Sequence, residues 1–339
     1  MEVTGATVVS VTDPSQVSAA RRSGADIAAA LDFDATAAGT VAIVVTEAGT
    51  NLLKHAGGGD VVLRGGRRET TPAWVELLAL DRGPGMANVA RCLEDGFSTS
   101  GSLGTGLGAL RRLASIFDVY SRPGLGTALL ARVSGSIADR AACPAMRLEV
   151  EGLAVPKPGE EECGDAFAEE PRGDGTTILV VDGLGHGPSA AAAARAAVAA
   201  FRGSPRHRPA QRLEAVHQAL RATRGAAVAI ADLDVAAGVV RFAGLGNIAG
   251  RIHADGAVQN LLSQPGTAGH VARKIDEYTY ALPPGAVLVL HSDGLTAHYD
   301  LDRYPGLAQR HPALIAGVLL RDAGRGRDDA TVVVARVGP

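Results

Sequence analysis

The sequence predicts an α+β protein built from two domains. Its 339 residues are enough for two separate hydrophobic cores. Short apolar runs typical of strands outnumber the segments with helical periodicity, and they do not alternate regularly with helices. Around residues 135–145 the pattern changes to small and polar residues, so we expect domains over 1–134 and 146–339 joined by a linker.

The composition is that of an ordinary globular protein and argues against several functional classes. Hydrophobic residues make up 46% of the chain and charged residues 20%, with a formal net charge of −3. Because no run of lysine and arginine stands out, we expect no binding to nucleic acid or to anionic membranes. The three cysteines are scattered and form neither a disulfide framework nor a zinc motif. The start of the chain has no basic and apolar leader pattern, which predicts a cytoplasmic protein.

The N-terminal half is expected to form one long helix, a shorter helix and several strands. Apolar residues recur at helical spacing over Ala35–His55, and the glycine run Gly57–Gly59 ends this helix. The glycine-rich stretch Gly96–Gly108 leads into a second helix through Leu110 and Ile116. Runs of β-branched and apolar residues between turn residues predict strands. These strands are Ala6–Val11, Val61–Arg64, Trp74–Leu80, Asp118–Ser121 and Thr127–Val133.

The C-terminal half is expected to be richer in strands, with three helices between them. The spacing of apolar residues predicts helices over Ser189–Phe201, Ala210–Ala222 and Leu307–Leu320. Because strands follow one another without regular crossover helices, a parallel doubly wound sheet is disfavoured. The predicted strands are Met146–Leu153, Asp165–Glu169, Thr177–Asp182, Ala226–Leu233, Val239–Ala243, Ala249–His253, Val287–His291 and Ala330–Val337.

Two polar motifs in the N-terminal half have the chemistry of a nucleotide site. Glu47 and Asn51 are four residues apart on the predicted helix, so they project from one face. An amide oxygen such as that of Asn51 can complete the oxygen shell of a phosphate-bound magnesium ion, and Glu47 can accept a proton from an attacking hydroxyl. Asp81 ends an apolar strand, where it can accept a hydrogen bond from an exocyclic amine. Gly83 and Gly85 let the backbone approach a flat base closely.

A third motif is the glycine run that contains Gly104, Gly106 and Gly108 and precedes a predicted helix. Such a run exposes backbone N–H groups, and a helix N-terminus favours phosphate. Each motif alone also fits a plain loop or a solvated helix face. The three motifs in this order predict an ATP site.

Together the three motifs resemble the GHKL ATPases, and specifically the short serine kinases of that family that regulate sigma-factor pathways. The resemblance covers residues 1–134, and the segment Thr46–Gly59 is similar to the N-box of those kinases. It implies a Bergerat fold, which is an α/β sandwich with Mg-ATP bound between the sheet and a helix. It also implies that Asn51 contacts Mg²⁺, that Glu47 is the catalytic base and that Asp81 binds adenine.

The C-terminal half places aspartates at the ends of apolar strands. A cluster of carboxylates repels itself unless cations neutralise it, and hard oxygen ligands select Mg²⁺ or Mn²⁺. Two such ions lower the pKa of a water and stabilise the attacking and leaving oxygens of a phosphate ester. The pattern therefore predicts a metal-dependent site for phosphate-ester hydrolysis. The aspartates concerned are Asp165, Asp182, Asp293, Asp328 and Asp329.

The segment 180–187, with the sequence VVDGLGHG, resembles the SpoIIE-like branch of the PPM (type 2C) serine/threonine phosphatases. The resemblance runs over residues 146–339 and implies an αββα sandwich, in which two antiparallel sheets pack together between layers of helices. Asp329 occupies a position where eukaryotic relatives commonly have asparagine, so either Asp328 or Asp329 fits the last ligand position. The resemblance implies that the metal ligands are Asp165, Asp182, the Gly183 carbonyl, Asp293 and Asp328 or Asp329.

His186 follows Asp182 by four residues, and an imidazole can protonate a leaving alkoxide. Many PPM enzymes have the sequence Asp-Gly-His, with the histidine two residues after the metal-binding aspartate. Here Leu184 and Gly185 intervene. His186 therefore fits either a catalytic role or a role in the turn that starts the next helix.

The two sites together predict a bacterial signalling regulator that contains an Mg-ATP-dependent serine kinase-like domain and a metal-dependent protein phosphatase domain. By family resemblance, its partner is a small STAS-domain phosphoprotein, either an anti-sigma antagonist or a stressosome component. Two alternatives stay open at this point. The N-terminal domain could bind ATP only as a sensor that regulates the phosphatase, or it could be a binding module that sequesters a sigma factor or its antagonist.

Overall fold

The computed structural model describes residues 2–3, 5–68, 71–94, 106–135, 147–205 and 207–338. The chain divides into two compact units, Met1–Ala142 and Cys143–Pro339, and each unit has its own sheets and hydrophobic core. The division falls within the segment expected to link two domains, of which only residue 135 is described. The limits of the domains stay a prediction.

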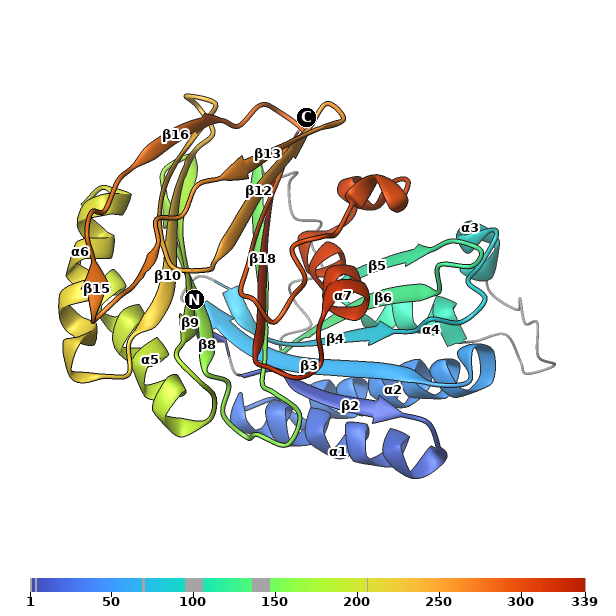
Figure 1. Cartoon of the computed structure of the whole chain (residues 1–339). Coiled ribbons are helices and arrows are strands. Elements are labelled where there is room, and N and C mark those ends of the chain that lie inside the picture. The colour runs from blue at the N-terminus through green and yellow to red at the C-terminus, as the bar shows by residue number, and fades with distance from the viewer. Residues whose placement is uncertain are drawn as a thin grey trace. The chain divides into compact units, whose positions relative to one another are not determined.

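The N-terminal unit contains a six-stranded antiparallel sheet in the order β1-β3-β4-β6-β5, with β2 also paired to β3. Helices α1 and α2 lie along one face of this sheet (Figure 1). Leu63 and Leu77 are paired in register and share the face that packs against Val41 and Val44 of α2. The strands are β1 Glu2–Val3, β2 Thr7–Val11, β3 Gly59–Arg68, β4 Thr71–Leu80, β5 Ile116–Ser121 and β6 Thr127–Ser134. The helices are α1 Pro14–Ala30, α2 Ala35–Asn51, α3 Val89–Cys92 and α4 Gly106–Leu113.

A side-chain cap sets the start of α2, the second of the two long helices. Asp34 accepts a hydrogen bond from the Ala37 N–H at 2.7 Å and begins α2 where the sequence predicts it. The predicted helix continues past Asn51 as a wider π-helical turn, Leu52–Ala56, and ends at Gly57 in a left-handed conformation. Helix α1 was not predicted, because its alanine, serine and glycine residues give only a weak apolar periodicity.

One prediction for this unit is wrong. Ile116 begins strand β5, whereas we expected it to continue the helix through Leu110. The helix ends at Leu113, and the Ser115 N–H donates to the Arg132 carbonyl, so pairing with β6 takes over. Tertiary pairing therefore overrides the local helical pattern at this position.

The C-terminal unit contains two five-stranded antiparallel sheets, in the orders β16-β11-β10-β9-β8 and β13-β12-β17-β18-β7. The first sheet consists of β8 Asp165–Arg172, β9 Gly175–Gly183, β10 Ala226–Asp234, β11 Val239–Leu245 and β16 Tyr278–Ala281. The second consists of β7 Leu148–Val155, β12 Ala249–Ala254, β13 Ala257–Leu261, β17 Val287–His291 and β18 Ala330–Val337. A small hairpin pairs β14 Gly266–Thr267 with β15 Val271–Ala272.

The two sheets pack face to face and are flanked by helices, which is the αββα sandwich that the resemblance implied (Figure 1). One core lies between the sheets and includes Val180 and Leu290, and a second includes Val181 and packs beneath α5 and α6. Alternate residues of β9 thus serve the two cores, which explains its continuous apolar run. The helices are α5 Pro188–Arg202, α6 Pro209–Ala219 and α7 Pro312–Ala323, and α7 packs on β7 and β18.

The predicted start of the last helix is also wrong. The segment Leu307–Gln309 forms a short 3-10 turn, and α7 begins at Pro312. A proline fits the first turn of a helix but disrupts its interior, so a helix that started at Leu307 could not run through Pro312. His311 caps α7 by accepting a hydrogen bond from the Ala313 N–H at 3.3 Å.

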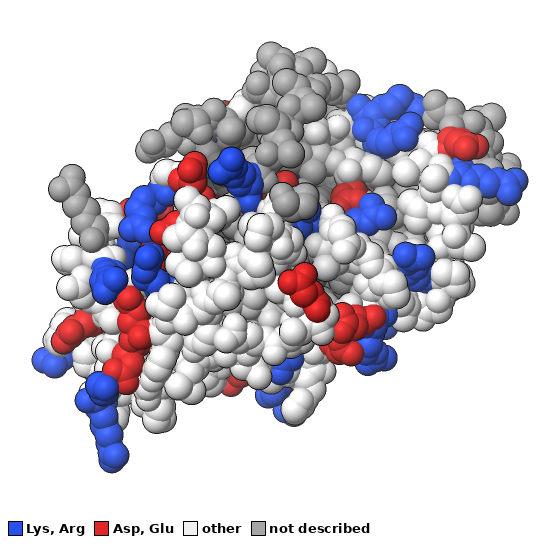
Figure 2. Space-filling view, turned by 90° about the horizontal axis from the view of Figure 1, so that it is seen from above, with Lys and Arg blue, Asp and Glu red and all other residues white. Residues whose placement is uncertain are grey.

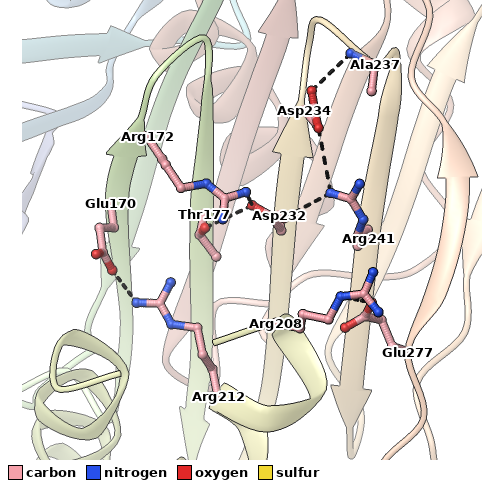
Figure 3. A network of polar contacts seen from close by, with 10 residues as sticks. All are labelled: Glu170, Arg172, Thr177, Arg208, Arg212, Asp232, Asp234, Ala237, Arg241 and Glu277. Atoms are coloured by element: carbon pink, nitrogen blue, oxygen red, sulfur yellow. Dashed lines mark hydrogen bonds and ion pairs between the residues drawn. The ribbon is translucent and has the colours of Figure 1, made fainter. Parts of the chain in front are cut away.

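A network of charged side chains lies on the helix-facing side of the β8–β9 sheet (Figure 3). Asp232 is 5% exposed and accepts hydrogen bonds from Arg172 at 2.7 Å, from the Thr177 hydroxyl at 3.1 Å and from Arg241 at 3.3 Å. Thr177 lies about 16 Å from Asp182 along β9, at about 3.3 Å per residue. The network therefore stabilises the end of the sheet that is remote from Asp182.

Candidate functional sites

Helix α2 and the start of α4 bring together three residues of the predicted nucleotide site. Glu47 and Asn51 lie one turn apart at the C-terminal end of α2, and both are half-buried. Gly106 begins α4, and a Cβ atom at this glycine would lie 3.5 Å from Asn51 Oδ1 and 3.8 Å from Glu47 Oε2. The amide, the carboxylate and the N-terminal end of α4 are therefore neighbours.

Asp81 follows β4 directly and is 8% exposed. Its Oδ1 accepts hydrogen bonds from the backbone N–H groups of Gly83, at 2.8 Å, and Thr127, at 3.0 Å. These bonds fix the carboxylate at the edge of the sheet and tie the first glycine motif to β6.

The two glycines of this motif have a packing reason of their own. A Cβ at Gly83 would lie 2.7 Å from the Cβ of Ala56, at the end of the α2 segment. Gly85 has φ +71°, and its Cβ would lie 2.0 Å from the carbonyl oxygen of Arg122. The motif is therefore held against both the helix and β5, which fixes its place at the site. Of the third motif, Gly104 lies outside the described residues, whereas Gly106 and Gly108 form the first turn of α4 and Gly108 is buried.

The predicted metal ligands lie at the ends of four strands of the C-terminal unit, β8, β9, β17 and β18. Asp165 begins β8 and is paired in register with Asp182 on β9, which ends at Gly183. Burial, followed by the charges of Asp293, Asp328 and Asp329, raises the pKa of Asp182 to about 7. Burial, followed by the charge of Asp182, holds the pKa of Asp165 well above its usual range. Carboxylates distant in sequence therefore face one another closely enough to repel.

This set of donors fits a hard divalent cation in its chemistry. It offers only oxygen atoms, and a cation would relieve the repulsion that raises the two pKa values. Among the described residues, no three His, Cys, Asp or Glu side chains already stand close enough to hold a metal ion.

Asp328 and Asp329 are placed differently by the structure. Asp329 is 3% exposed, and its two oxygens accept hydrogen bonds from the backbone N–H groups of Lys157, at 2.8 Å, and Gly164, at 3.0 Å. Asp328 is exposed and accepts a hydrogen bond from the Asp329 N–H at 3.0 Å. Asp329 thus holds the loop between β7 and β8, and the choice between Asp328 and Asp329 as metal ligand stays a prediction.

Two residues of this site were not predicted as parts of it. The Ser292 hydroxyl donates to Asp165 Oδ2 at 2.6 Å and accepts from the Thr331 N–H at 2.9 Å, so it fixes one ligand from the next sheet. The Asn247 amide donates to Asp293 Oδ2 at 2.8 Å, so it holds a second predicted ligand. The sequence did contain one signal that could have identified Ser292, which is its position directly before Asp293.

His186 lies in the turn between β9 and α5. The glycines on either side of it, Gly185 and Gly187, have φ +89° and φ +73°, a conformation that other residues rarely adopt. The His186 side chain is 46% exposed. The turn therefore presents this imidazole at the surface, four residues after Asp182.

On the face shown in Figure 2, lysine and arginine side chains are interspersed with aspartate and glutamate. None of the helices in the described part of the chain has the length and apolar character needed to cross a bilayer.

Comparison with known proteins assigns families to both halves of the chain. The family model for the histidine kinase-like ATPase domain matches residues 11–133. The family model for stage II sporulation protein E (SpoIIE) matches residues 172–338, which include every predicted metal ligand except Asp165. The chain is 33% identical to the serine/threonine-protein kinase RsbT of Bacillus subtilis (strain 168) over 113 residues, which are 33% of this chain and 84% of that kinase.

Solved structures agree with this assignment. A chain solved in work on the bacterial stressosome, described as a modular system adapted to control secondary messenger signaling, is 30% identical with a TM-score of 0.52. That likeness covers 56% of this chain and 99% of the solved one. RsbX, crystallised in complex with magnesium, shares the fold at 19% identity and a TM-score of 0.50, over 58% of this chain and 98% of its own. The chain therefore belongs to the histidine kinase-like ATPase family through its N-terminal unit and to the SpoIIE family of PPM phosphatases through its C-terminal unit.

Proposed function

We propose that this protein both adds and removes a phosphate on serine or threonine residues of small STAS-domain regulators, as part of a sigma-factor or stressosome circuit. The observation that carries the proposal is the presence, on one chain, of a unit related to a serine/threonine kinase and a unit of a phosphatase family. Opposing reactions on one chain suit a cycle in which the phosphorylation state of one partner is set by the balance of two sites.

In the kinase reaction, Glu47 is the base that takes the proton of the attacking hydroxyl. Asn51, one turn away, would hold a magnesium ion bound with ATP, and Asp81 would accept a hydrogen bond from the adenine amine. The proximity of Gly106 to Glu47 and Asn51 supports this assignment, because the start of α4 then lies where phosphate would be held. Gly83, Gly85, Gly104 and Gly108 complete the nucleotide site.

In the phosphatase reaction, the metal ligands are Asp165, Asp182, the Gly183 carbonyl, Asp293 and Asp328. Mg²⁺ or Mn²⁺ bound there would supply a water of lowered pKa and neutralise charge on the phosphate. Ser292 and Asn247 orient Asp165 and Asp293 through the hydrogen bonds described above. His186 is the general acid that protonates the leaving oxygen of serine or threonine.

The proposal is tested by incubating the purified chain with a candidate STAS protein and labelled ATP. We expect a labelled partner to form and then to release its phosphate, with release stopped by chelation and restored by manganese. In the Asp182→Asn variant the labelled partner should accumulate, because only the removal step is lost. Phosphate release that depends on ATP without any labelled partner would show that the N-terminal unit senses ATP and transfers nothing.

A further inference from the structure

The loop between β7 and β8 carries a carboxylate that contacts His186. Glu160 Oε1 lies 2.7 Å from His186 Nδ1, within hydrogen-bonding distance. The Glu160 and His186 side chains are 29% and 46% exposed, so they form a pair at the surface rather than in the core. Among the described residues, no other hydrogen bond or ion pair involves the His186 ring.

The backbone on both sides of this pair is constrained so that the two groups meet. A Cβ at Gly187 would lie 3.0 Å from Glu160 Oε2, in a residue that already has a positive φ. Asp329 holds the Glu160 loop near both of its ends, through the N–H groups of Lys157 and Gly164.

The loop and the His186 turn also meet at the carboxylate cluster. The carbonyl oxygen of Gly185 lies 3.5 Å from the Cβ position of Gly164, and that position is 2.7 Å from Asp329 Oδ2. The pair of Glu160 and His186 is therefore built onto the edge of the phosphatase site.

We infer that Glu160 is a positioning residue that orients His186 as the general acid of the phosphatase site, an inference that rests on the phosphatase function proposed above. A carboxylate at this distance keeps a proton on Nδ1 and fixes the plane of the ring. With Nδ1 engaged by Glu160, Nε2–H is the donor of the protonated ring that remains for the leaving oxygen.

The proposed step is the hydrolysis of a phosphoserine or phosphothreonine ester. A water oxygen forms a bond to phosphorus and releases one proton to solvent, and the bond between phosphorus and the seryl or threonyl oxygen breaks. The electron pair of that bond goes to the leaving oxygen, which takes the proton from His186 Nε2. The neutral ring keeps its Nδ1 proton against Glu160 and regains a proton on Nε2 from solvent, to which it is half-exposed.

Two substrates separate this role from a structural one. p-Nitrophenyl phosphate has a good leaving group that needs no proton, whereas a phosphoserine peptide has a poor one that does. With manganese present, we expect His186→Gln to lower turnover of the peptide about 100-fold. We expect Glu160→Ala to lower it about 10-fold, as is common for carboxylates that orient an imidazole. Both variants should lose much less turnover of p-nitrophenyl phosphate than of the peptide, because only the peptide's leaving oxygen needs a proton. A circular dichroism spectrum like that of the wild type shows that they are folded.

The same loop offers a matched control. Glu162 pairs with Arg195 of α5 at 2.7 Å, which is the same distance as in the Glu160 pair, and both partners are exposed. Glu162→Ala removes an ion pair between the loop and α5 but leaves His186 untouched, so we expect both substrates to be hydrolysed at the wild-type rate. A second measurement needs no metal, because nitrogen NMR of the full chain reports which His186 nitrogen bears the proton. The neutral ring should be protonated on Nδ1 in the wild type, and this preference should be lost in Glu160→Ala.

The outcomes distinguish the inference from the function on which it rests. If the wild-type protein with manganese hydrolyses neither substrate, the phosphatase function itself is overturned. If the wild type hydrolyses both, but Glu160→Ala and Glu162→Ala lower peptide turnover equally, Glu160 only anchors the loop and the inference is overturned. An unchanged His186 tautomer in Glu160→Ala overturns it as well.

Discussion

At the scale of single residues, adjacent aspartates before β18 have different roles. Asp329 holds two backbone N–H groups of the β7–β8 loop, whereas Asp328 is exposed beside the carboxylate cluster. We predict that Asp329→Ala lowers the free energy of unfolding by about 2 kcal/mol or more, because it leaves two N–H groups without their charged acceptor. Asp328→Ala should leave stability unchanged and weaken manganese binding. Denaturant titration and calorimetric metal titration measure the two effects, and equal stability losses would contradict the distinction.

Asp81 is held in place by its own backbone contacts, which makes a conservative substitution informative. We predict that Asp81→Asn keeps the fold, since an amide oxygen can still accept from Gly83 and Thr127, but weakens ATP binding through loss of the charged acceptor for the adenine amine. Competition of ATP and GTP against a fluorescent ATP analogue measures the effect. Equal competition by GTP in the wild type would argue against adenine recognition by Asp81.

His253 gives the C-terminal unit a pH-dependent stability. It lies beside the Tyr299 ring, with 5.8 Å between the ring centroids, and burial holds its pKa below 6.5. As pH falls below about 6.5, the unfolded chain takes up a proton that the folded histidine does not, so stability falls toward acid pH.

We predict that His253→Gln removes this loss. The stability of the variant relative to the wild type should therefore rise as pH falls from 7 to 5, by at most about 1.4 kcal/mol per pH unit. Denaturant melts of both proteins across this range check the sign. The raised pKa values of Asp165 and Asp182 favour the folded state as pH falls, which is opposite to the effect of His253. This contribution cancels when the two proteins are compared, because both contain the two aspartates. If the stability difference between His253→Gln and the wild type stays constant with pH, the pKa of His253 does not change on folding and the prediction is wrong.

At the scale of elements, β9 has the polar network at one end, around Thr177, and the predicted metal ligand Asp182 at the other. The network around Asp232 ties β8, β9, β10 and β11 together through Arg172, Thr177 and Arg241 (Figure 3). We predict that Asp232→Ala lowers the free energy of unfolding by about 2 kcal/mol, because hydrogen bonds to a charged acceptor are lost. Turnover of p-nitrophenyl phosphate by the folded variant should be unchanged, since Asp182 lies at the other end of β9. A loss of turnover without a loss of stability would contradict this division.

At the scale of the whole molecule, the two units carry their sites separately. We predict that Glu47→Ala stops phosphate transfer to the partner and leaves hydrolysis of p-nitrophenyl phosphate intact, whereas Asp182→Asn does the reverse. Cutting the chain within residues 135–145 should preserve both activities, since each unit has its own core. The combined cycle should slow at low protein concentration, because fusion raises the effective concentration of one site near a partner held by the other.

One result would contradict the separation of the two sites. Loss of phosphatase turnover in Glu47→Ala would make the ATP site a control element, and the kinase assignment would have to be dropped. Assays of the two activities on the intact and the divided chain, over a range of concentrations, provide the measurement.

The sequence by itself determined the α+β class and most of the elements, and it predicted the chemistry of both sites. Glu47 and Asn51 share a face because helical spacing is local, and the aspartates at strand ends follow from apolar runs that can be read directly. It did not reveal β13 or β16, because these edge strands are largely exposed and lack a clear apolar alternation.

Only the tertiary structure decided which neighbours support the site. The partners Asp329 and Gly164 are 165 residues apart in the chain, Ser292 and Asp165 are 127 apart, and Glu160 and His186 are 26 apart. Each pair lies in or beside a loop or strand end whose position depends on sheet register and on how the sheets pack. Local periodicity carries no information about such contacts, because they form only when distant strands have been brought to one edge of the sandwich.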